Sequence, residues 1–467
     1  MRFKKQLHWP VKMAYGAAET GIVGAEVVLW VYLYKFYNEV VGLPAEWVGL
    51  ALALSIIWDA FSDVLMGVIS DRTAFASGRR RPYLLPGALG LALALIALFH
   101  PPEMQSIPAK FGYLLGAYLC LNTAMTVLSV PHAALGGDLS FERDERTELY
   151  GFRLLFGTFG LLIGTILPAS FLRSESPSTM EVAYSREMAA LWLAAPILIT
   201  AFITWRATRG LDHAARKKFI WNLPEIAFTT LKSSWSTLRN GYFRPIFAAF
   251  VVAGIGRTLN SSIALYYYEY RLRISEQDTA FYILAPFFLV LIVSIGFWVW
   301  ISRRFGKKKP AIIGVSILGV MTCILYPILP PGNLAGPILA AFIGGVSGGA
   351  VFLFDSMVAD VVDYDELRTG ENREGVYFGA WKMGQKLARA LGLALTGLIL
   401  PAIGIDPAQS AVTDTEAIAY LFGPGVGAFF LVAAVLAALT PLTDARHRRI
   451  QDLLFNRRQQ RNVDEFA

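Results

Sequence analysis

Apolar runs of transmembrane length recur along the whole chain and leave few folds open to it. A helix needs about 20 mainly apolar residues to cross the hydrocarbon core, where each backbone polar group must be hydrogen-bonded within the protein. About twelve runs meet this criterion. They lie near residues 11–38, 45–70, 82–100, 111–137, 149–172, 187–206, 244–270, 278–302, 310–329, 335–362, 374–403 and 419–440. The pattern predicts an all-α membrane protein.

The composition agrees with a chain that lies mostly in lipid. Of its 467 residues, 55% are hydrophobic and only 16% are charged, too few charges to cover a soluble protein of this size. The net charge of +7 comes from short turns rather than one basic face, which argues against a nucleic-acid partner. The cysteines, Cys120 and Cys323, lie inside apolar runs and predict neither a disulfide framework nor a zinc site.

Basic residues gather after the second, eighth and last runs, which fall on one side of the membrane if the helices alternate. The turns on the other side, such as 38–46 and 405–417, carry acidic or few charged residues. The positive-inside rule therefore predicts a multi-pass protein of the inner (plasma) membrane with both termini cytoplasmic. The first run contains Glu19 and Glu26, so we interpret it as a transmembrane helix rather than a cleaved signal peptide.

Two segments of the first half have counterparts in the second. GVISDRTAFASGRRRP after the second run resembles WISRRFGKKKP after the eighth, and GGDLSFERDERTELYGFR after the fourth corresponds to ADVVDYDELRTGENREGVYFGAW after the tenth. Such matches indicate parallel repeats, the arrangement of an alternating-access carrier with two six-helix halves. We expect helical bundles at 1–206 and 244–443, a cytoplasmic tail at 444–467, and a connecting loop at 207–243 that is either a solvated linker or carries amphipathic surface helices.

Two acidic residues, Asp59 and Asp63, lie in the second apolar run. Residues four apart share a helix face, so both carboxylates are expected to point into one site. A charge near the bilayer centre costs about 2.5–3.5 kcal/mol, and two carboxylates in one site repel each other unless a cation or proton lies between them. The pair therefore predicts a site for a coupling cation. The alternative is a pair of structural acids bonded to hydroxyl groups in the bundle.

The eleventh run carries Lys386, with Lys382 and Arg389 on the same helix face. A lysine in an apolar run needs a counter-ion, and we expect Lys386 to pair with Asp59 or Asp63 when the cation leaves. The alternative is that the lysines extend to the membrane surface. In the same run, Tyr377 and Trp381 are candidates for lining a substrate cavity or for packing.

Sequence patterns of nucleotide- and metal-dependent enzymes are missing from the chain. It has no GxxxxGK[ST] stretch, so an ATP-driven pump is not expected, and no HExxH or Cys/His cluster. We expect a protein that is not an enzyme and has no cofactor. An alternative of another class is a membrane-embedded enzyme whose acids hold a divalent metal for lipid head-group transfer, and a third is a sensor that kept the fold but lost transport.

The segments WDAFSDVLMG and DR…GRRRP resemble the major facilitator superfamily. Together with VPHAALGGDLSFERDERTELYGFR and MVADVVDYDELRTGENREGVYFGAWKMGQKLARALG, they are similar to the glycoside–pentoside–hexuronide:cation symporters over nearly the whole chain. The resemblance implies the major facilitator fold. It also implies symport of a sugar or glycoside with Na⁺ or H⁺ by alternating access. The expected protein is a monomer whose partners are the lipid bilayer and a small-molecule substrate.

The resemblance also assigns roles to individual residues. Asp59 and Asp63 correspond to the cation-binding acids, and they would be the metal ligands if the ion is Na⁺. Thr126 corresponds to a threonine that joins that site, Lys386 to a lysine that approaches the acids, and Arg153 to an arginine implicated in sugar binding.

Two positions depart from the family pattern. Ser129 stands where an aspartate is found in the fourth span of the family's galactoside carrier, and Glu19 is only the nearest acid to a sugar-binding aspartate of span one. A less polar substrate, such as the lysolipids carried by related symporters, therefore stays open. Glu19 and Arg153 are each expected either to touch substrate or to be paired with another charged residue for packing. The alternative partner of Glu19 is Arg257 or Arg153. The alternative partner of Arg153 is Asp138 or Asp144.

Charged residues at the predicted cytoplasmic ends are candidates for gating. We expect the group after the second run to hold the second and third spans against the eleventh span in one state, through ion pairs. Its members are Asp71, Arg72, Arg79, Arg80 and Arg81, and Asp363, with its neighbours Asp360, Asp365 and Glu366, is the expected counterpart in the second half.

Overall fold

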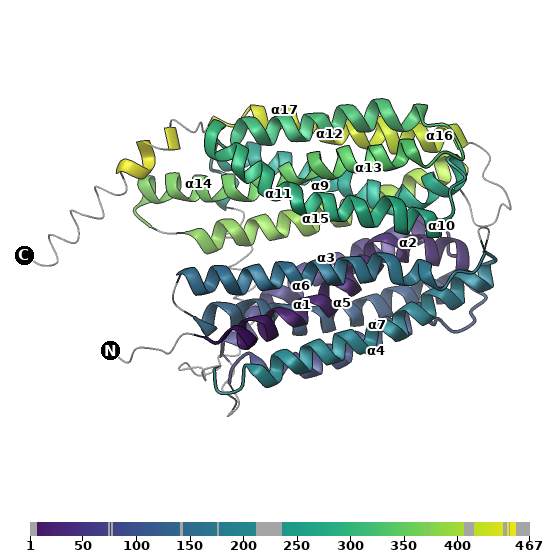
Figure 1. Cartoon of the computed structure of the whole chain (residues 1–467), viewed down its shortest axis with the longest axis horizontal. Helices are drawn as coiled ribbons and strands as arrows, with labels where there is room; N and C mark the ends of the chain where they lie inside the picture. The colour runs from purple at the N-terminus through teal and green to yellow at the C-terminus, as the bar shows by residue number, and fades with distance from the viewer. Residues whose placement is uncertain are drawn as a thin grey trace, which may run out of the picture. The chain divides into compact units, whose positions relative to one another are not determined.

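The computed structural model describes residues 7–72, 75, 78–140, 143–174, 177–211, 236–371, 373–405, 415–441, 446–447 and 449–453, and for residues 72, 143 and 144 it describes the backbone alone. Helices form nearly all of the regular structure in these ranges (Figure 1). The predicted loop at 207–243 and tail at 444–467 fall largely outside the described residues, so these assignments stay predictions.

All six spans expected in the first half are helical. Helix α1 (Trp9–Val31) continues through α2 (Leu33–Lys35) into a π-helical segment, η1 (Phe36–Val40), and the axis bends by 49° at the break. The remaining elements are α3 (Ala45–Arg72), the 3₁₀ turn η2 (Arg81–Tyr83), α4 (Leu84–Phe99), α5 (Ile107–Leu139), α6 (Arg143–Ser170) and α7 (Thr179–Ala207).

The six spans expected in the second half are helical as well. Several contain short π or 3₁₀ segments, so they are less regular than the apolar pattern suggests. The elements are α9 (Phe243–Tyr266), η3 (Tyr267–Arg271), α10 (Glu276–Asp278), η4 (Thr279–Leu284), α11 (Ala285–Phe305), α12 (Lys308–Ile328), α13 (Ala335–Gly348), η5 (Gly349–Val351), α14 (Phe352–Thr369), α15 (Glu374–Ala402), α16 (Thr415–Tyr420), η6 (Leu421–Gly425) and α17 (Val426–Ala438).

The lengths of these helices fit a multi-pass membrane protein. In the described ranges, ten helices are long and apolar enough to span a bilayer, and the bent α1–η1 helix brings the number to eleven. The twelfth expected span is α15, a 29-residue helix. It is long enough to span, but three basic residues in its middle turns, Lys382, Lys386 and Arg389, lower its mean hydropathy.

The described residues separate into two compact units. One holds those within Met1–Leu223, Ser261–Phe288 and Leu393–Ile418, and the other those within Pro224–Asn260, Leu289–Gly392 and Ala419–Ala467. In the first unit, α1 packs against α6 and α7, and α5 packs against α3 and α4. In the second unit, α12 packs against α13 and α17. The expected bundle boundaries at 206 and 244 stay a prediction.

Small residues let α1 and α6 approach closely. A Cβ added at Gly160 of α6 would lie 2.3 Å from the carbonyl oxygen of Thr20 on α1, and one at Gly164 would lie 2.4 Å from that of Gly24. Transmembrane helices often use such contacts, because packing rather than the hydrophobic effect holds them together in lipid. This close approach places the acidic residue of α1, Glu19, beside α6.

Candidate functional site

Three oxygen atoms from α3 and α5 converge in the first unit. The hydroxyl oxygen of Thr126 lies 3.0 Å from Oδ1 of Asp59 and 2.8 Å from Oδ1 of Asp63. The hydroxyl of Ser62 lies 3.2 Å from the same threonine oxygen. Asp59 and Asp63 are half-buried and Thr126 is buried. The structure thus brings together the three residues expected to form a cation site, two from helix spacing and one from the resemblance.

The chemistry of this oxygen cluster favours a positive charge. The Thr126 hydroxyl has a single hydrogen, so it can donate to only one of the two carboxylates at a time. Its contact with the other carboxylate brings two oxygen lone pairs together. A proton, or a cation that prefers oxygen ligands, stabilises such an arrangement. In the described part of the chain, no group of three or more His, Cys, Asp or Glu side chains is arranged to hold a metal.

A second polar cluster joins α1, α5 and α6. Arg153 of α6 donates from Nε and Nη2 to the two carboxylate oxygens of Glu19, at 3.0 and 2.8 Å. Nδ1 of His132, a fully buried residue of α5, lies 3.2 Å from Oε2 of Glu19. The two residues expected to touch substrate are therefore in contact with each other, which was one of the two expectations for them. Their role towards substrate stays a prediction.

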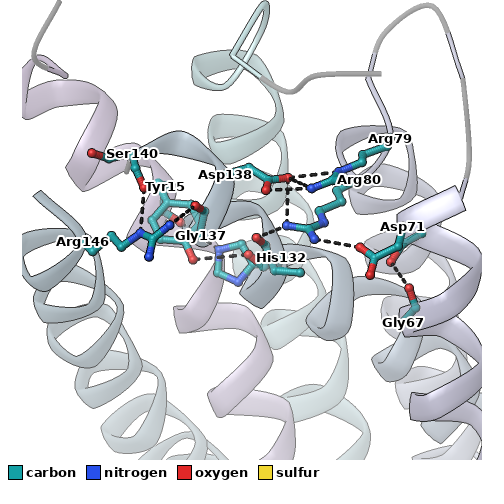
Figure 2. Close-up of polar contacts among 12 residues, drawn as sticks. Tyr15, Gly67, Asp71, Arg79, Arg80, His132, Gly137, Asp138, Ser140 and Arg146 are labelled. Atoms are coloured by element: carbon teal, nitrogen blue, oxygen red, sulfur yellow. Dashed lines mark hydrogen bonds and ion pairs between the residues drawn. The ribbon is translucent and has the colours of Figure 1, made fainter. Parts of the chain in front are cut away.

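The arginine turn before α4 makes ion pairs with α3 and α5 (Figure 2). Arg80 lies between two acids, 2.7 Å from Asp71 and 2.8 Å from Asp138, and Arg79 contacts Asp138 at 2.7 Å. Asp138 was expected as a partner of Arg153, but Arg153 is paired with Glu19 instead.

Arg81 turns towards α7. Its Nε donates to the carbonyl oxygen of Trp205 at 2.6 Å, and its guanidinium lies 4.3 Å from the centre of that indole ring. The side chains of Arg72 and Asp144 lie outside the described part. The contacts described for Arg79, Arg80 and Arg81 connect elements of the first unit, and the expected contact with the eleventh span stays a prediction.

The second unit contains a matching basic turn. Lys307, which follows α11, contacts Asp360 of α14 at 2.5 Å, as Arg80 contacts the acid at the end of α5. Asp363 accepts from Nε2 of His447 at 3.0 Å. In both turns a glycine with positive φ precedes the basic residues, Gly78 with φ 117° and Gly306 with φ 78°. The two turns therefore share backbone and charge chemistry, in agreement with the internal repeat.

The candidate residues of α15 lie in the second unit. Tyr377 is buried and its hydroxyl accepts from the side-chain amide of Asn240 at 2.8 Å. Trp381 is stacked on Phe250, and its indole N–H donates to Oδ1 of Asp355 at 2.5 Å. Lys386 is half-buried. Substrate roles for Tyr377 and Trp381, and a role for Lys386 beside the aspartates of the first unit, stay predictions.

Sequence reasoning missed His132 and Asp355. Both are polar residues within apolar runs, the same signal that singled out Asp59. Neither has a charged neighbour four residues away, so the sequence pattern did not predict either of them as a site residue.

A further missed group joins α2 and η1 to residues 267–276 in the first unit. Lys35 contacts Glu269 and lies 3.4 Å from Glu39, and Tyr270 donates to Glu39 at 2.6 Å. The guanidinium of Arg186 on α7 is paired with Glu276 on α10, and both side chains are buried. These contacts tie first-half helices to a segment far along the chain that belongs to the same unit.

Comparison with known proteins gives a consistent result. The family model for MFS/sugar transport proteins matches residues 14–444. The chain is 25% identical to an isoprimeverose transporter of Lactiplantibacillus pentosus, over 91% of this chain and 87% of that protein. It is 26% identical to a putative glycoside/cation symporter, YagG, of Escherichia coli (strain K12), over 97% and 96%. Among solved structures it is similar to the nucleoside transporter NupG, with a TM-score of 0.63, 13% identity, and 93% and 100% of the two chains covered. At that identity the likeness shows the fold.

Proposed function

The chain belongs to the MFS/sugar transport protein family, and we propose that it carries a sugar or glycoside together with a Na⁺ ion or proton bound at Asp59 and Asp63. Membership of this family makes it a multi-pass membrane transporter of the symporter class, with the major facilitator fold, and not an enzyme. The substrate class, a sugar or glycoside, and the coupling to a Na⁺ ion or proton are the parts that we propose.

The observation that carries the proposal is the convergence of two carboxylates on one hydroxyl. Asp59, Asp63 and Thr126 present three oxygen atoms to one point, and the single hydroxyl hydrogen can be donated to only one of the two carboxylates at a time. A cation bound there would lower the repulsion between the carboxylates. The relative named as a putative glycoside/cation symporter supports coupling to a cation.

The same neutralisation would couple the ion to the cargo. With the ion bound, the site carries less net charge and crosses between the two states of an alternating-access carrier at lower cost. With the ion gone, Lys386 takes its place as counter-charge, which resets the carrier. The ion pairs of Arg80 with Asp71 and Asp138 hold one end of the first unit during this change.

Glu19 and Arg153 are the proposed polar ligands of the substrate in the first unit. Together they offer hydrogen-bond acceptors and a guanidinium fork, which suit the hydroxyl groups of a sugar. Tyr377 and Trp381 are proposed to supply aromatic surface from the second unit. Sugars present apolar faces between their hydroxyls, and such faces pack well on aromatic rings.

Transport in proteoliposomes tests the proposal. Purified protein is reconstituted and assayed by counterflow and by gradient-driven uptake with a panel of labelled sugars, glycosides and lysolipids, with and without a Na⁺ gradient. Asp59→Asn and Asp63→Asn are expected to lose gradient-driven uptake. Glu103→Gln, which changes an exposed acid between α4 and α5, is the matched control and should retain it. Full gradient-driven uptake by either asparagine variant would show that the assignment of the cation site is wrong. Accumulation of lysolipids alone would overturn the proposal that the substrate is a sugar or glycoside.

A further inference from the structure

His132 of α5 is a fully buried histidine whose two ring nitrogens face two different oxygens. Nε2 lies 2.9 Å from the backbone carbonyl oxygen of Tyr15, and Nδ1 lies 3.2 Å from Oε2 of Glu19. The imidazole is also stacked on the ring of Tyr15, with centroids 4.9 Å apart (Figure 2). Each contact restricts where the protons of the imidazole can be.

The backbone contact fixes the first proton. A carbonyl oxygen only accepts hydrogen bonds, so Nε2 must carry a hydrogen. In a neutral imidazole, which has one N–H, Nδ1 would then present a bare lone pair. That lone pair would point at a carboxylate.

The contacts of Glu19 show that this carboxylate is ionised. Both of its oxygens accept from Arg153, at 3.0 and 2.8 Å, which is the bidentate geometry of a guanidinium–carboxylate ion pair. A neutral His132 would therefore hold a buried lone pair 3.2 Å from an anionic oxygen. A proton on Nδ1 turns this repulsion into an ion pair.

We propose that His132 and Glu19 form a proton-binding site in the first unit, with the proton held on Nδ1 of His132 against Oε2 of Glu19. The distance fits an ion pair, while the N–H direction is not yet that of a hydrogen bond, and Nδ1 makes none in the described structure. The site is separate from Asp59 and Asp63 and goes beyond the proposed cation site.

The surrounding charges come from three directions. Tyr15 of α1 covers one face of the ring, Arg153 of α6 holds Glu19, and the guanidinium of Arg153 lies 5.8 Å from the ring centre of Tyr150. Further along α5, Asp138 is bound by the arginine turn that also contacts Asp71 of α3 (Figure 2). Glu19 is therefore in contact with two basic side chains, His132 and Arg153.

The proton is expected to affect Arg153. When His132 carries it, Glu19 is divided between two cations, and the guanidinium is held less tightly. When the proton leaves, Glu19 turns wholly to Arg153 and away from the Nδ1 lone pair. If Arg153 and Glu19 bind substrate, as proposed above, substrate affinity will depend on pH apart from any coupling ion. This consequence rests on the proposed function, whereas the proton site does not.

Nitrogen NMR of the whole protein tests the site directly. The chain, labelled with ¹⁵N at its five histidines, is placed in lipid nanodiscs at about pH 7.5. We expect a histidine signal with hydrogens on both ring nitrogens that His132→Gln removes. In Glu19→Gln the same residue should keep a hydrogen on Nε2 alone.

A matched control comes from a second histidine–glutamate pair. His100 lies 3.1 Å from Glu187 but its side chain is 67% exposed, and His100→Gln should leave the doubly protonated signal unchanged. The proposal is overturned if His132 has a bare Nδ1 in the natural protein at this pH, or if its signals are the same in Glu19→Gln. If His132→Gln cannot be purified, His132→Asn supplies the assignment. None of these spectra depends on transport, so failure of the transport assay and failure of this site are distinguishable.

Discussion

Replacing Thr126 by valine is the sharpest test of the oxygen cluster. Valine has nearly the shape of threonine, so the substitution removes the hydroxyl that contacts Asp59 at 3.0 Å and Asp63 at 2.8 Å with little change in packing at this buried position. The carboxylates keep their place on α3, but the point where the oxygens meet loses one ligand. Threonine to serine, which keeps the hydroxyl, is the matched control.

The size of the effect follows from the charge on the partners. A hydrogen bond or ligand contact to a charged group contributes about 1.5–3 kcal/mol. At about 1.4 kcal/mol for each factor of ten, the loss weakens cation binding by about 10- to 100-fold. Thr126→Val should therefore raise the half-saturating concentration of Na⁺ or H⁺ by that factor, while the uptake rate at saturating cation stays near that of the natural protein.

The assay is initial uptake in proteoliposomes over a range of external Na⁺ at fixed pH, and of external pH without Na⁺. The ion whose curve shifts is the coupling ion. An unchanged half-saturating concentration for both ions in Thr126→Val would show that the hydroxyl is not a ligand. A loss of uptake at every concentration in both Thr126→Val and Thr126→Ser would point to packing instead.

Three further predictions concern the framework and the polar cluster. Arg186→Leu leaves the buried carboxylate of Glu276 without its guanidinium, so the variant should lose about 3–5 kcal/mol of stability, measured by thermal or denaturant unfolding in detergent, and should recover much of it when Glu276→Leu is added. Gly160→Ala forces α1 and α6 apart and should lower the melting temperature, whereas Gly151→Ala, where an added Cβ meets nothing within 4 Å, should not; equal melting temperatures would contradict the close contact. Arg153→Lys replaces a two-pronged contact by a single point charge, so it should raise the KM for substrate about 10-fold or more at nearly unchanged kcat; an unchanged KM would remove the residue from the substrate site.

Local sequence features account for the fold class. The apolar runs predict the helices because run length and backbone hydrogen bonding in lipid leave no other regular structure, and the twelve expected runs all fall on helices. Two of these helices depart from a straight, fully apolar span, and both departures are local. The first span bends by 49° between α1 and α2, and α15 is less apolar than its neighbours because it carries three basic residues. Neither feature changes the fold.

The same local reasoning found part of the site. Asp59 and Asp63 share one face because they are four residues apart on one helix, which the sequence alone determines. Thr126, 63 residues beyond Asp63 and on another helix, was expected only from the family resemblance, and in the structure its hydroxyl contacts both acids. The functional roles of all three stay predictions.

Which charges are paired was decided by the tertiary structure. A charged side chain in an apolar run needs a partner, and the sequence shows that need, but the partner is selected by how helices distant in the chain pack. Arg153 pairs with Glu19 rather than with Asp138, because Gly160 and Gly164 let α6 lie close along α1. His132 joins the same carboxylate from α5, a contact over more than 100 residues that no spacing rule contains. The sequence determined where charge is buried in this protein, and only the packing of the helices determined what each charge meets.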